Sequence, residues 1–119
     1  MPVSLQEFTK ALDALELSIK APKTDITRDA TIQRFEFSVE LAWKSTRKIM
    51  GSSTTAPKQI IREMAQNNFI DNVEFWLSAI DHRNLSSHTY NQELAEKVYT
   101  FAEKFLPEAK KLLTKLKAS

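Results

Sequence analysis

Residues 31–50 read TIQRFEFSVELAWKSTRKIM, and this stretch decides the fold because its apolar side chains recur at helical spacing. One stripe, at intervals of three and four residues, consists of Ile32, Phe35, Val39, Ala42, Thr46 and Ile49. Phe37, Leu41 and Trp43 add apolar surface on other faces. A helix that is apolar beyond one stripe is either central in a bundle or buries a second face against a partner. We therefore expect a long helix from about Thr27 to Met50, and a homodimer that covers its surplus apolar surface.

The segment before this helix carries a second stripe, which predicts an antiparallel neighbour. Ser4 followed by Glu7 is typical of a capping box and predicts a helix that opens at Leu5. Its stripe consists of Leu5, Phe8, Leu12, Leu15 and Ile19. Pro22 is expected to end this helix, because proline cannot continue the backbone hydrogen bonds. The linker that follows is short, so the two helices should pack antiparallel.

Two shorter helices are expected in the middle of the chain. Gly51 suits the C-terminal cap of the long helix, because glycine readily adopts a positive φ. Pro57 suits the first turn of a third helix, which should end near Asn67. Asp71 followed by Glu74 predicts a capping box that opens a fourth helix.

The last part of the chain predicts a fifth helix, which begins after a break near Ser86. Either Asn91 alone or Thr89 with Gln92 can cap its start. Its stripe consists of Leu94, Val98, Phe101 and Phe105, followed by Leu112, Leu113 and Leu116. Pro107 is expected to kink or restart this helix, since proline removes a backbone donor.

These elements predict an all-α fold, an up-and-down antiparallel bundle of about five helices in a single domain over residues 1–119. The length suits one domain, and 42% hydrophobic residues can supply its core. A single glycine disfavours a β-sandwich or barrel, which needs many tight turns. No apolar run approaches the ~20 residues that span a bilayer, and the start does not resemble a signal peptide. We therefore expect a cytoplasmic protein that does not enter a membrane.

The chain concentrates its polar chemistry in residues 81–90, DHRNLSSHTY, which hold both of its histidines. In a continuous helix, Arg83 and His88 would lie about 140° apart and therefore on different faces. Asparagine and serine side chains compete for backbone hydrogen bonds, so a helix break is expected here. Such a break would let His88 fold back towards Arg83.

Several roles fit this segment. In the simplest one, its polar side chains are purely structural and serve as helix caps and surface groups. A metal site has little support, because the two histidines share no helix face and the chain has no cysteine. A Ser-His-Asp triad could be drawn from Asp81, His88 and a nearby serine, but such residues are common at any helix end. A histidine that moves a proton and an arginine that binds phosphate could together cleave RNA without a metal. No cofactor is expected.

The positive charges add little support for nucleic-acid binding. The net charge of +2 is small. The lysines of the last helix are expected to form a solvated face, because no aromatic side chains interleave with them; a patch for RNA phosphates is the alternative. These lysines are Lys104, Lys110, Lys111, Lys115 and Lys117.

Residues 83–90, RNLSSHTY, resemble the Arg-x(4–6)-His signature of HEPN domains, in the form Arg-x-x-x-x-His-x-Tyr. The stretch from Ile32 to Lys44 is similar to one HEPN branch, the nucleotidyltransferase substrate-binding proteins that pair with minimal nucleotidyltransferases. The likeness extends to residues 56–58 and to Trp76, and so covers nearly the whole chain. This resemblance implies a HEPN-like bundle that forms a homodimer, with the motif near the dimer cleft.

The resemblance also implies a toxin–antitoxin role. HEPN toxins are metal-independent ribonucleases with the motif arginine and histidine, here Arg83 and His88, at the active site. The partner nucleotidyltransferase acts as antitoxin and adds AMP to the motif tyrosine, here Tyr90. Asn84 matches the polar residue that often follows the motif arginine, whereas His82 matches no part of the signature and is expected to be structural. Some members are described only as substrate-binding subunits, so a non-catalytic subunit of a nucleotidyltransferase complex is the alternative function.

Overall fold

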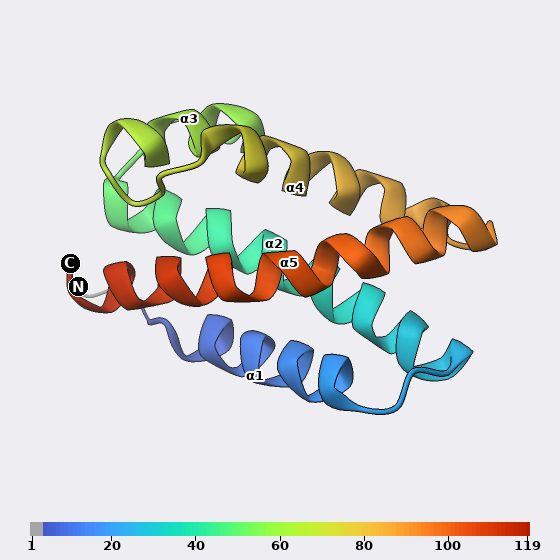
Figure 1. Ribbon diagram of the computed structural model, residues 1–119. Coiled ribbons are helices and arrows are strands. Elements are labelled where there is room, and N and C mark those ends of the chain that lie inside the picture. Colours follow the sequence, from blue (N-terminus) through green and yellow to red (C-terminus); the bar gives the residue numbers. More distant parts are fainter. Residues whose placement is uncertain (1–3) are drawn as a thin grey trace.

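The computed structural model describes residues 4–119, which form five α-helices and one 3-10 turn. The elements are α1 (Gln6–Lys20), α2 (Asp25–Met50), α3 (Pro57–Gln66), α4 (Val73–Leu85), the 3-10 turn η1 (Ser86–His88) and α5 (Gln92–Lys117). Helices α1 and α4 run in one direction along the bundle, and α2 and α5 run in the other (Figure 1). No strand occurs among these described residues, so the predicted all-α bundle is confirmed. No helix in residues 4–119 is both long and apolar enough to cross a membrane.

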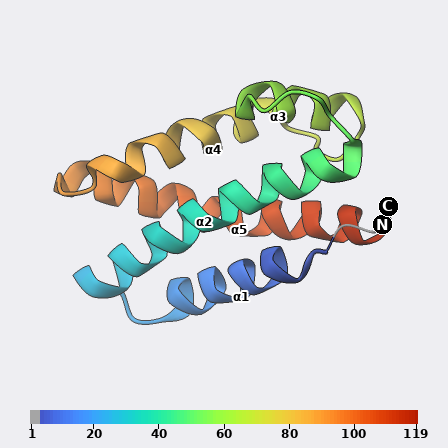
Figure 2. The same ribbon diagram turned by 180° about the vertical axis from the view of Figure 1, so that it is seen from behind.

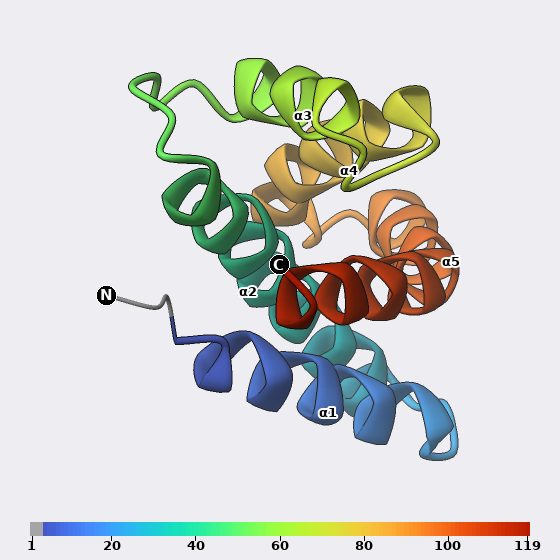
Figure 3. The same cartoon turned by 90° about the vertical axis from the view of Figure 1, so that its left-hand side faces the viewer.

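The helices form three tiers when the bundle is seen from one end (Figure 3). Helix α1 makes one tier, α2 and α5 make the middle tier, and α3 and α4 make the third. Helix α2 contacts every other helix. The beginning of α1 and the end of α5 lie at one end of the bundle, and the connection from α4 to α5 lies at the other (Figures 1 and 2). The segment that contains the candidate catalytic residues therefore caps one end of the molecule.

The predicted stripe of α2 forms the centre of the core. Phe35, Val39 and Ala42 are each at most 1% exposed. The Phe35 ring packs edge-on against Phe105 of α5 with centroids 5.2 Å apart, and Phe105 packs in the same manner against Trp76 of α4 at 5.3 Å. Each such aromatic pair contributes about 0.5–1.5 kcal/mol beyond the burial of its area. One aromatic cluster thus joins α2, α4 and α5, as expected for a central helix.

The start of α1 differs from the prediction. Leu5, not Ser4, occupies the N-cap position, and the helix begins at Gln6 without a side-chain cap bond. The Ser4 hydroxyl lies one residue too early and accepts only a long 3.4 Å bond from the Gln6 N–H. The predicted capping box of Ser4 with Glu7 is therefore wrong, because the serine is not the residue at which the helical backbone starts.

Two other helix starts are capped by residues that were not predicted from the sequence. Thr24 caps α2, which therefore begins at Asp25 and not near Thr27; the hydroxyls of Thr24 and Thr27 accept each other's backbone N–H at 3.1 and 2.7 Å. Asn72 caps α4 through a 3.0 Å bond from the N–H three residues on, so the predicted cap at Asp71 is wrong. The capping box of α2 was not recognised in the sequence, because its third helical position holds Thr27 in place of the usual Glu or Gln.

The predicted helix ends are confirmed. Helix α1 stops at Lys20, two residues before Pro22, and α3 begins at Pro57 and is followed by Asn67 at its C-cap. Gly51 follows α2 with φ of 65°, the left-handed conformation expected of a C-terminal glycine.

Helix α5 runs unbroken from Gln92 to Lys117 although Pro107 lies inside it, so the predicted restart is wrong. Pro107 and Glu103 are both exposed, so the carbonyl that loses its usual donor can be hydrated. On the opposite face, Phe105 and Leu112 are buried in one continuous core on either side of the proline. The two halves of α5 therefore bury their apolar side chains in the same core.

Candidate active site

The motif begins where α4 tightens into the 3-10 turn η1. The predicted break near Ser86 is confirmed, because η1 covers residues 86–88 and α5 starts only at Gln92. Hydroxyl groups supply the local competition: the side chains of Ser86, Ser87 and Thr89 each donate to the carbonyl three residues earlier. Of the two predicted caps for α5, Asn91 alone is used, accepting the N–H groups two and three residues on at 2.9 and 3.3 Å.

Arg83 lies in the last turn of α4 and is held by a carboxylate of α2. Its Nε donates to Oε1 of Glu40 at 2.7 Å, and the two side chains are 31% and 27% exposed. Glu40 also meets the Nζ of Lys44 at 3.4 Å. No hydrogen bond within residues 4–119 occupies the two terminal nitrogens of Arg83. The guanidinium is therefore fixed at one edge and keeps its outer edge available for an anion such as a phosphate.

A second carboxylate of α2 holds the turn itself. The buried Ser86 hydroxyl lies 3.0 Å from Oε2 of Glu36, so its single proton is shared between this carboxylate and the Arg83 carbonyl. Glu36 and Glu40 lie one turn apart on α2, so they meet positions 83 and 86, which are also about one turn apart. Neither contact was foreseen from the sequence. The only signal there was weak: two acidic residues four positions apart beside the buried stripe.

His88 and Tyr90 project from the end of the bundle. Both are exposed, Tyr90 to 87%, and their ring centroids are 6.3 Å apart with the planes at 76°. Asn84 is exposed as well. No hydrogen bond in the described part of the chain joins His88 to Arg83, so the break does not bring these two side chains within hydrogen-bonding distance. Arg83 is anchored on α2, whereas the His88 ring is exposed and forms no hydrogen bond within residues 4–119.

The structure gives little support to the two alternative sites considered for this segment, a Ser-His-Asp triad and a metal site. Asp81 pairs with Lys58 at 2.7 Å, and the Ser86 and Ser87 hydroxyls are engaged with Glu36 and the backbone, so no triad forms around His88. Among residues 4–119, no three His, Asp or Glu side chains gather closely enough to hold a metal ion.

His82, which was expected to be structural, is packed against α5. Its Nδ1 lies 2.8 Å from the carbonyl of Ser78, one turn earlier in α4. Its ring stacks on Phe101 with centroids 4.0 Å apart and planes at 12°. These contacts fix the orientation of the imidazole directly beside the motif arginine.

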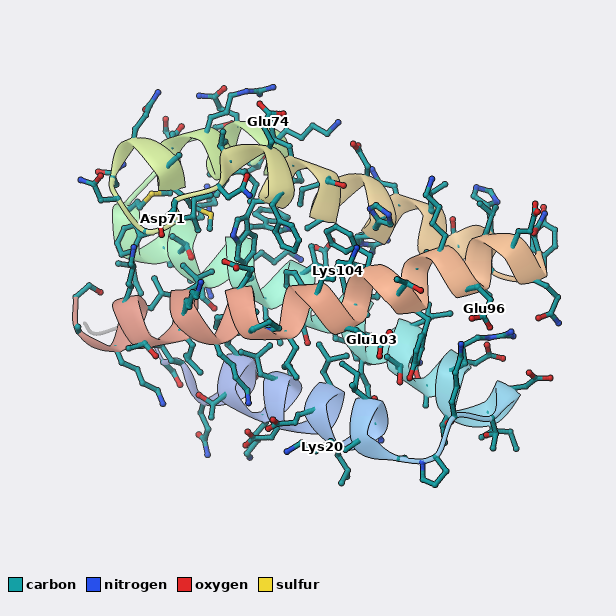
Figure 4. All side chains as sticks on the ribbon, in the orientation of Figure 1. Lys20, Asp71, Glu74, Glu96, Glu103 and Lys104 are labelled. Carbon is teal, nitrogen blue, oxygen red and sulfur yellow. The ribbon has the colours of Figure 1, made fainter. Side chains whose placement is uncertain are left out.

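An ionic network ties the helix that follows the motif to the start of α2. Arg28 is buried and donates to Gln92 at 2.6 Å and Glu96 at 3.3 Å, both in the first turns of α5. Glu96 projects from α5 near the motif end of the bundle (Figure 4). A hydrogen bond from Lys23 lowers the pKa of the Glu96 carboxyl below its ordinary value. The motif is thus flanked by α4, held through Glu40 and Glu36, and by α5, held through Arg28.

Comparison with known proteins identifies the family to which this chain is similar. The family model described as "Nucleotidyltransferase substrate binding protein like" matches residues 3–118. The chain is 34% identical over 94 residues to "Probable ribonuclease HepT" of Haemophilus influenzae. That alignment covers 72% of this chain and 64% of the relative, so it spans less than two thirds of the relative's length.

Two solved structures share the fold across nearly the whole chain. The protein ttk003001694 of Thermus thermophilus is 28% identical, with a TM-score of 0.84 over 92% of this chain and 98% of its own. HI0074 of Haemophilus influenzae, a substrate binding domain of a nucleotidyltransferase, is 29% identical, with a TM-score of 0.84 over 96% and 99%. The resemblance first drawn from residues 32–44 and 83–90 is thereby confirmed. The chain belongs to the nucleotidyltransferase substrate binding protein like family.

Proposed function

We propose that this chain is a HEPN protein that pairs with a minimal nucleotidyltransferase and cleaves RNA without a metal ion, using Arg83 and His88. The observation that carries the proposal is the arrangement of these two side chains. Arg83 is anchored through Nε by Glu40 with its outer edge available, and His88 is exposed one short turn away. The name of the HepT relative, a probable ribonuclease, supports the same reaction class.

The proposed reaction is an internal transfer at one RNA phosphate. His88 takes the proton of the ribose 2′-hydroxyl, and the 2′-oxygen attacks the adjacent phosphorus. The bond from phosphorus to the 5′-oxygen of the next nucleotide breaks, and that oxygen takes a proton from water as it leaves, while His88 returns its proton to the solvent. The products are a 2′,3′-cyclic phosphate and a 5′-hydroxyl. The terminal nitrogens of Arg83 stabilise the negative charge that develops on the phosphoryl oxygens.

A homodimer belongs to this proposal, although its basis is narrower than the sequence suggested. Trp43 lies in the core, so it does not contribute surplus apolar surface. Phe37 is 54% exposed, and the partly exposed Leu41 lies one turn further along α2. Both residues directly follow the acids that contact the motif, Glu36 and Glu40. A second copy of the chain that covers Phe37 would therefore lie beside the candidate active site.

Tyr90 is the proposed point of control by the nucleotidyltransferase. Its phenol oxygen would attack the α-phosphorus of ATP bound to the partner, releasing pyrophosphate and leaving AMP on the tyrosine. The high exposure of Tyr90 allows this access, and its ring lies 6.3 Å from that of His88. The added phosphate is an acceptor for the available nitrogens of Arg83 and would compete with RNA phosphate there. Asn84, also exposed, is a supporting residue in this proposal.

The alternative function, a non-catalytic subunit that presents substrate to the nucleotidyltransferase, is favoured by one observation. The charge of Arg83 is already offset by Glu40 at 2.7 Å, which weakens its attraction for an RNA phosphate. In this case Arg83 and Glu40 would be a structural pair, and exchange of His88 would change no reaction of the chain itself.

Incubation of the purified protein with total RNA in excess chelator separates the two functions. The proposal predicts fragments that end in 2′,3′-cyclic phosphate. His88→Ala should remove this activity, with a loss of about 10²–10⁴ in rate, and Arg83→Ala should reduce it severely. Gln66→Ala, an exposed change at the far end of the bundle, is the matched control. Cleavage that survives both motif changes, or that requires added Mg²⁺, would reject the mechanism.

Modification is tested separately by co-expression with the nucleotidyltransferase. Mass spectrometry of the peptide that contains Tyr90 should reveal an added AMP, and Tyr90→Phe should prevent it. A Tyr90→Phe variant that the partner still silences would contradict the control mechanism.

A further inference from the structure

Three aromatic rings form a stack between α4 and α5. Phe101 stacks on His82 with centroids 4.0 Å apart, and on Phe75 with centroids 4.9 Å apart and planes at 19°. His82 and Phe75 are seven residues apart on α4, which corresponds to a rise of about 10 Å. Phe101 therefore lies between them, and His82 is the end of the stack. One face of the His82 ring is covered by Phe101, and the other face is directed along α4 towards the motif.

Two lysines accompany this stack along α5. Lys97, Phe101 and Lys104 occupy positions i, i+4 and i+7, which lie on one face of a helix. Lys104 lies on the side of α5 that faces α4, whereas Glu103 lies on the side of α1 (Figure 4). Both lysines are exposed, and neither forms an ion pair within residues 4–119. Because α4 and α5 are antiparallel, Lys97 lies one turn beyond Phe101 on the side of the His82 face that Phe101 does not cover. His82 itself is partly exposed.

The stack and the lysines border one shallow groove of about 540 Å³, lined by His82, Glu93, Glu96, Lys97, Thr100, Phe101 and Lys104. Two carboxylates thus face the same groove as the two lysines. Glu96 is engaged by Lys23 and Arg28, so its charge is offset from the other side. Glu93 lies in the first turn of α5, where the helix dipole stabilises its charge. The part of the groove between Lys97 and Lys104 is therefore its most positive part.

We infer that this groove is a stacking platform for single-stranded RNA, in which an unpaired base lies on the face of His82 that Phe101 does not cover while Lys97 and Lys104 bind the flanking phosphates. The inference rests on the proposed function and names where its substrate lies outside Arg83 and His88. Aromatic rings that alternate with cations are the usual means of binding single strands without sequence preference. The lysines are about 10 Å apart along the helix axis, a distance that can accommodate the phosphates on either side of a stacked nucleotide.

The position of His82 links the platform to the motif. His82 directly precedes Arg83, and its ring is held by Ser78 and Phe101, so a base stacked on it occupies a fixed position. An RNA strand that is bound in this way would approach the outer edge of Arg83 in a restricted register. The platform therefore orients the strand, and His82 acts in binding and not in the transfer of a proton. Lys104 is exposed, as expected of a solvated face, and in this inference it would also bind a phosphate because Phe101 lies between Lys97 and Lys104.

The platform is tested by the binding of a short, labelled 2′-O-methyl oligonucleotide, measured by fluorescence anisotropy. This probe has no free 2′-hydroxyl, so it cannot be cleaved, and its binding is read whether or not the ribonuclease reaction exists. His82→Ala should raise Kd about tenfold, because it removes the surface on which the base stacks. His82→Phe should keep Kd within about twofold, because a ring remains in place.

The contribution of the phosphates is tested with the lysines. Lys97→Gln should raise Kd and lower the slope of log Kd against log salt by about 0.7, as expected for one lost phosphate contact on a single strand. Lys117→Gln, an exposed change at the other end of α5, is the matched control and should leave Kd unchanged.

Two results would overturn the inference: a wild-type protein that does not bind the probe at low salt, or His82→Ala binding as tightly as wild type. If circular dichroism reveals that His82→Ala is unfolded, the Lys97→Gln comparison decides. Absence of RNA cleavage in the chelator experiment would reject the proposed reaction and leave the binding result standing, so the two failures are distinguishable.

Discussion

The buried Arg28 network offers the most direct test of how this fold holds its motif. The side chain of Arg28 is 6% exposed and donates to Asp29 at 3.1 Å, Gln92 at 2.6 Å and Glu96 at 3.3 Å. The substitution Arg28→Met keeps the length of the apolar stem and removes the guanidinium. Three hydrogen bonds are lost, two of which join the start of α2 to the start of α5.

The loss of stability follows from these contacts. A hydrogen bond to a charged group contributes about 1.5–3 kcal/mol net, and one between neutral groups about 1 kcal/mol. The carboxylates of Asp29 and Glu96 are 62% and 47% exposed, so water screens them and can replace Arg28. Each of the three bonds is therefore assigned about 0.7–1 kcal/mol, below the range for a charged partner in the interior. We expect Arg28→Met to lower the free energy of unfolding by about 2–3 kcal/mol in all. For a chain of this size that corresponds to a fall in Tm of roughly 8–12 °C.

Urea denaturation followed by circular dichroism, with a thermal scan, measures this loss. Lys20→Met is the matched control, since it breaks the exposed ion pair with Glu16 and should change stability by less than about 0.5 kcal/mol. An Arg28→Met protein within about 1 kcal/mol of wild type would refute the argument that the network holds α5 in place.

The difference in stability between wild type and Arg28→Met should depend on pH. The pKa of Glu96 is lowered in the folded protein, chiefly by the hydrogen bond from Lys23 and also by that from Arg28. Its stabilising contribution is therefore present above the pKa of the unfolded chain and is lost as the pH falls through the folded pKa. The difference in stability between wild type and Arg28→Met should narrow below the ordinary glutamate pKa of 4.5. A difference that stays constant down to acid unfolding would contradict a role for Glu96.

Three further changes test the site and the fold. Glu40→Gln should lower stability by about 1 kcal/mol and reduce any RNA cleavage, because Arg83 loses the carboxylate that fixes it; Glu74→Gln, exposed at the start of α4, should do neither. Phe37→Glu should convert the proposed dimer to a monomer in light scattering with an unchanged helical spectrum, and a wild type that is monomeric at micromolar concentration would exclude that dimer. Gly51→Ala should cost about 1 kcal/mol in urea denaturation, solely from its φ of 65°, because no atom lies within 4 Å of an added Cβ.

Local signals in the sequence were sufficient for the positions of most helices. The stripe from Ile32 to Ile49 identified the central helix, and Pro22, Gly51 and Pro57 marked ends and starts that the structure has. The break near Ser86 was also predictable, since it depends on hydroxyl groups that bond to carbonyls three residues away. These features are encoded within one or two helical turns and therefore do not depend on the rest of the fold.

The candidate site residues were named from the sequence, because Arg83, His88 and Tyr90 stand in one short segment with a family pattern, and their roles remain proposals. The side chains that contact them from other helices could not be predicted from the sequence. Glu40 reaches Arg83 across 43 positions, and Glu36 reaches Ser86 across 50. In the sequence, these acids could not be told from ordinary surface pairs on a helix.

The tertiary structure alone decided which side chains meet across helices. Arg28 meets Glu96, and His82 stacks on Phe101, because of the rotation and relative height of packed helices. The continuity of α5 through Pro107 has the same origin, since burial of Phe105 and Leu112 in one core outweighs the local cost of the proline. Helical periodicity reveals which face of each helix is buried, but not the height at which two faces meet. That height, set by the close packing of the aromatic cluster, positions Glu40 on Arg83 and His82 on Phe101.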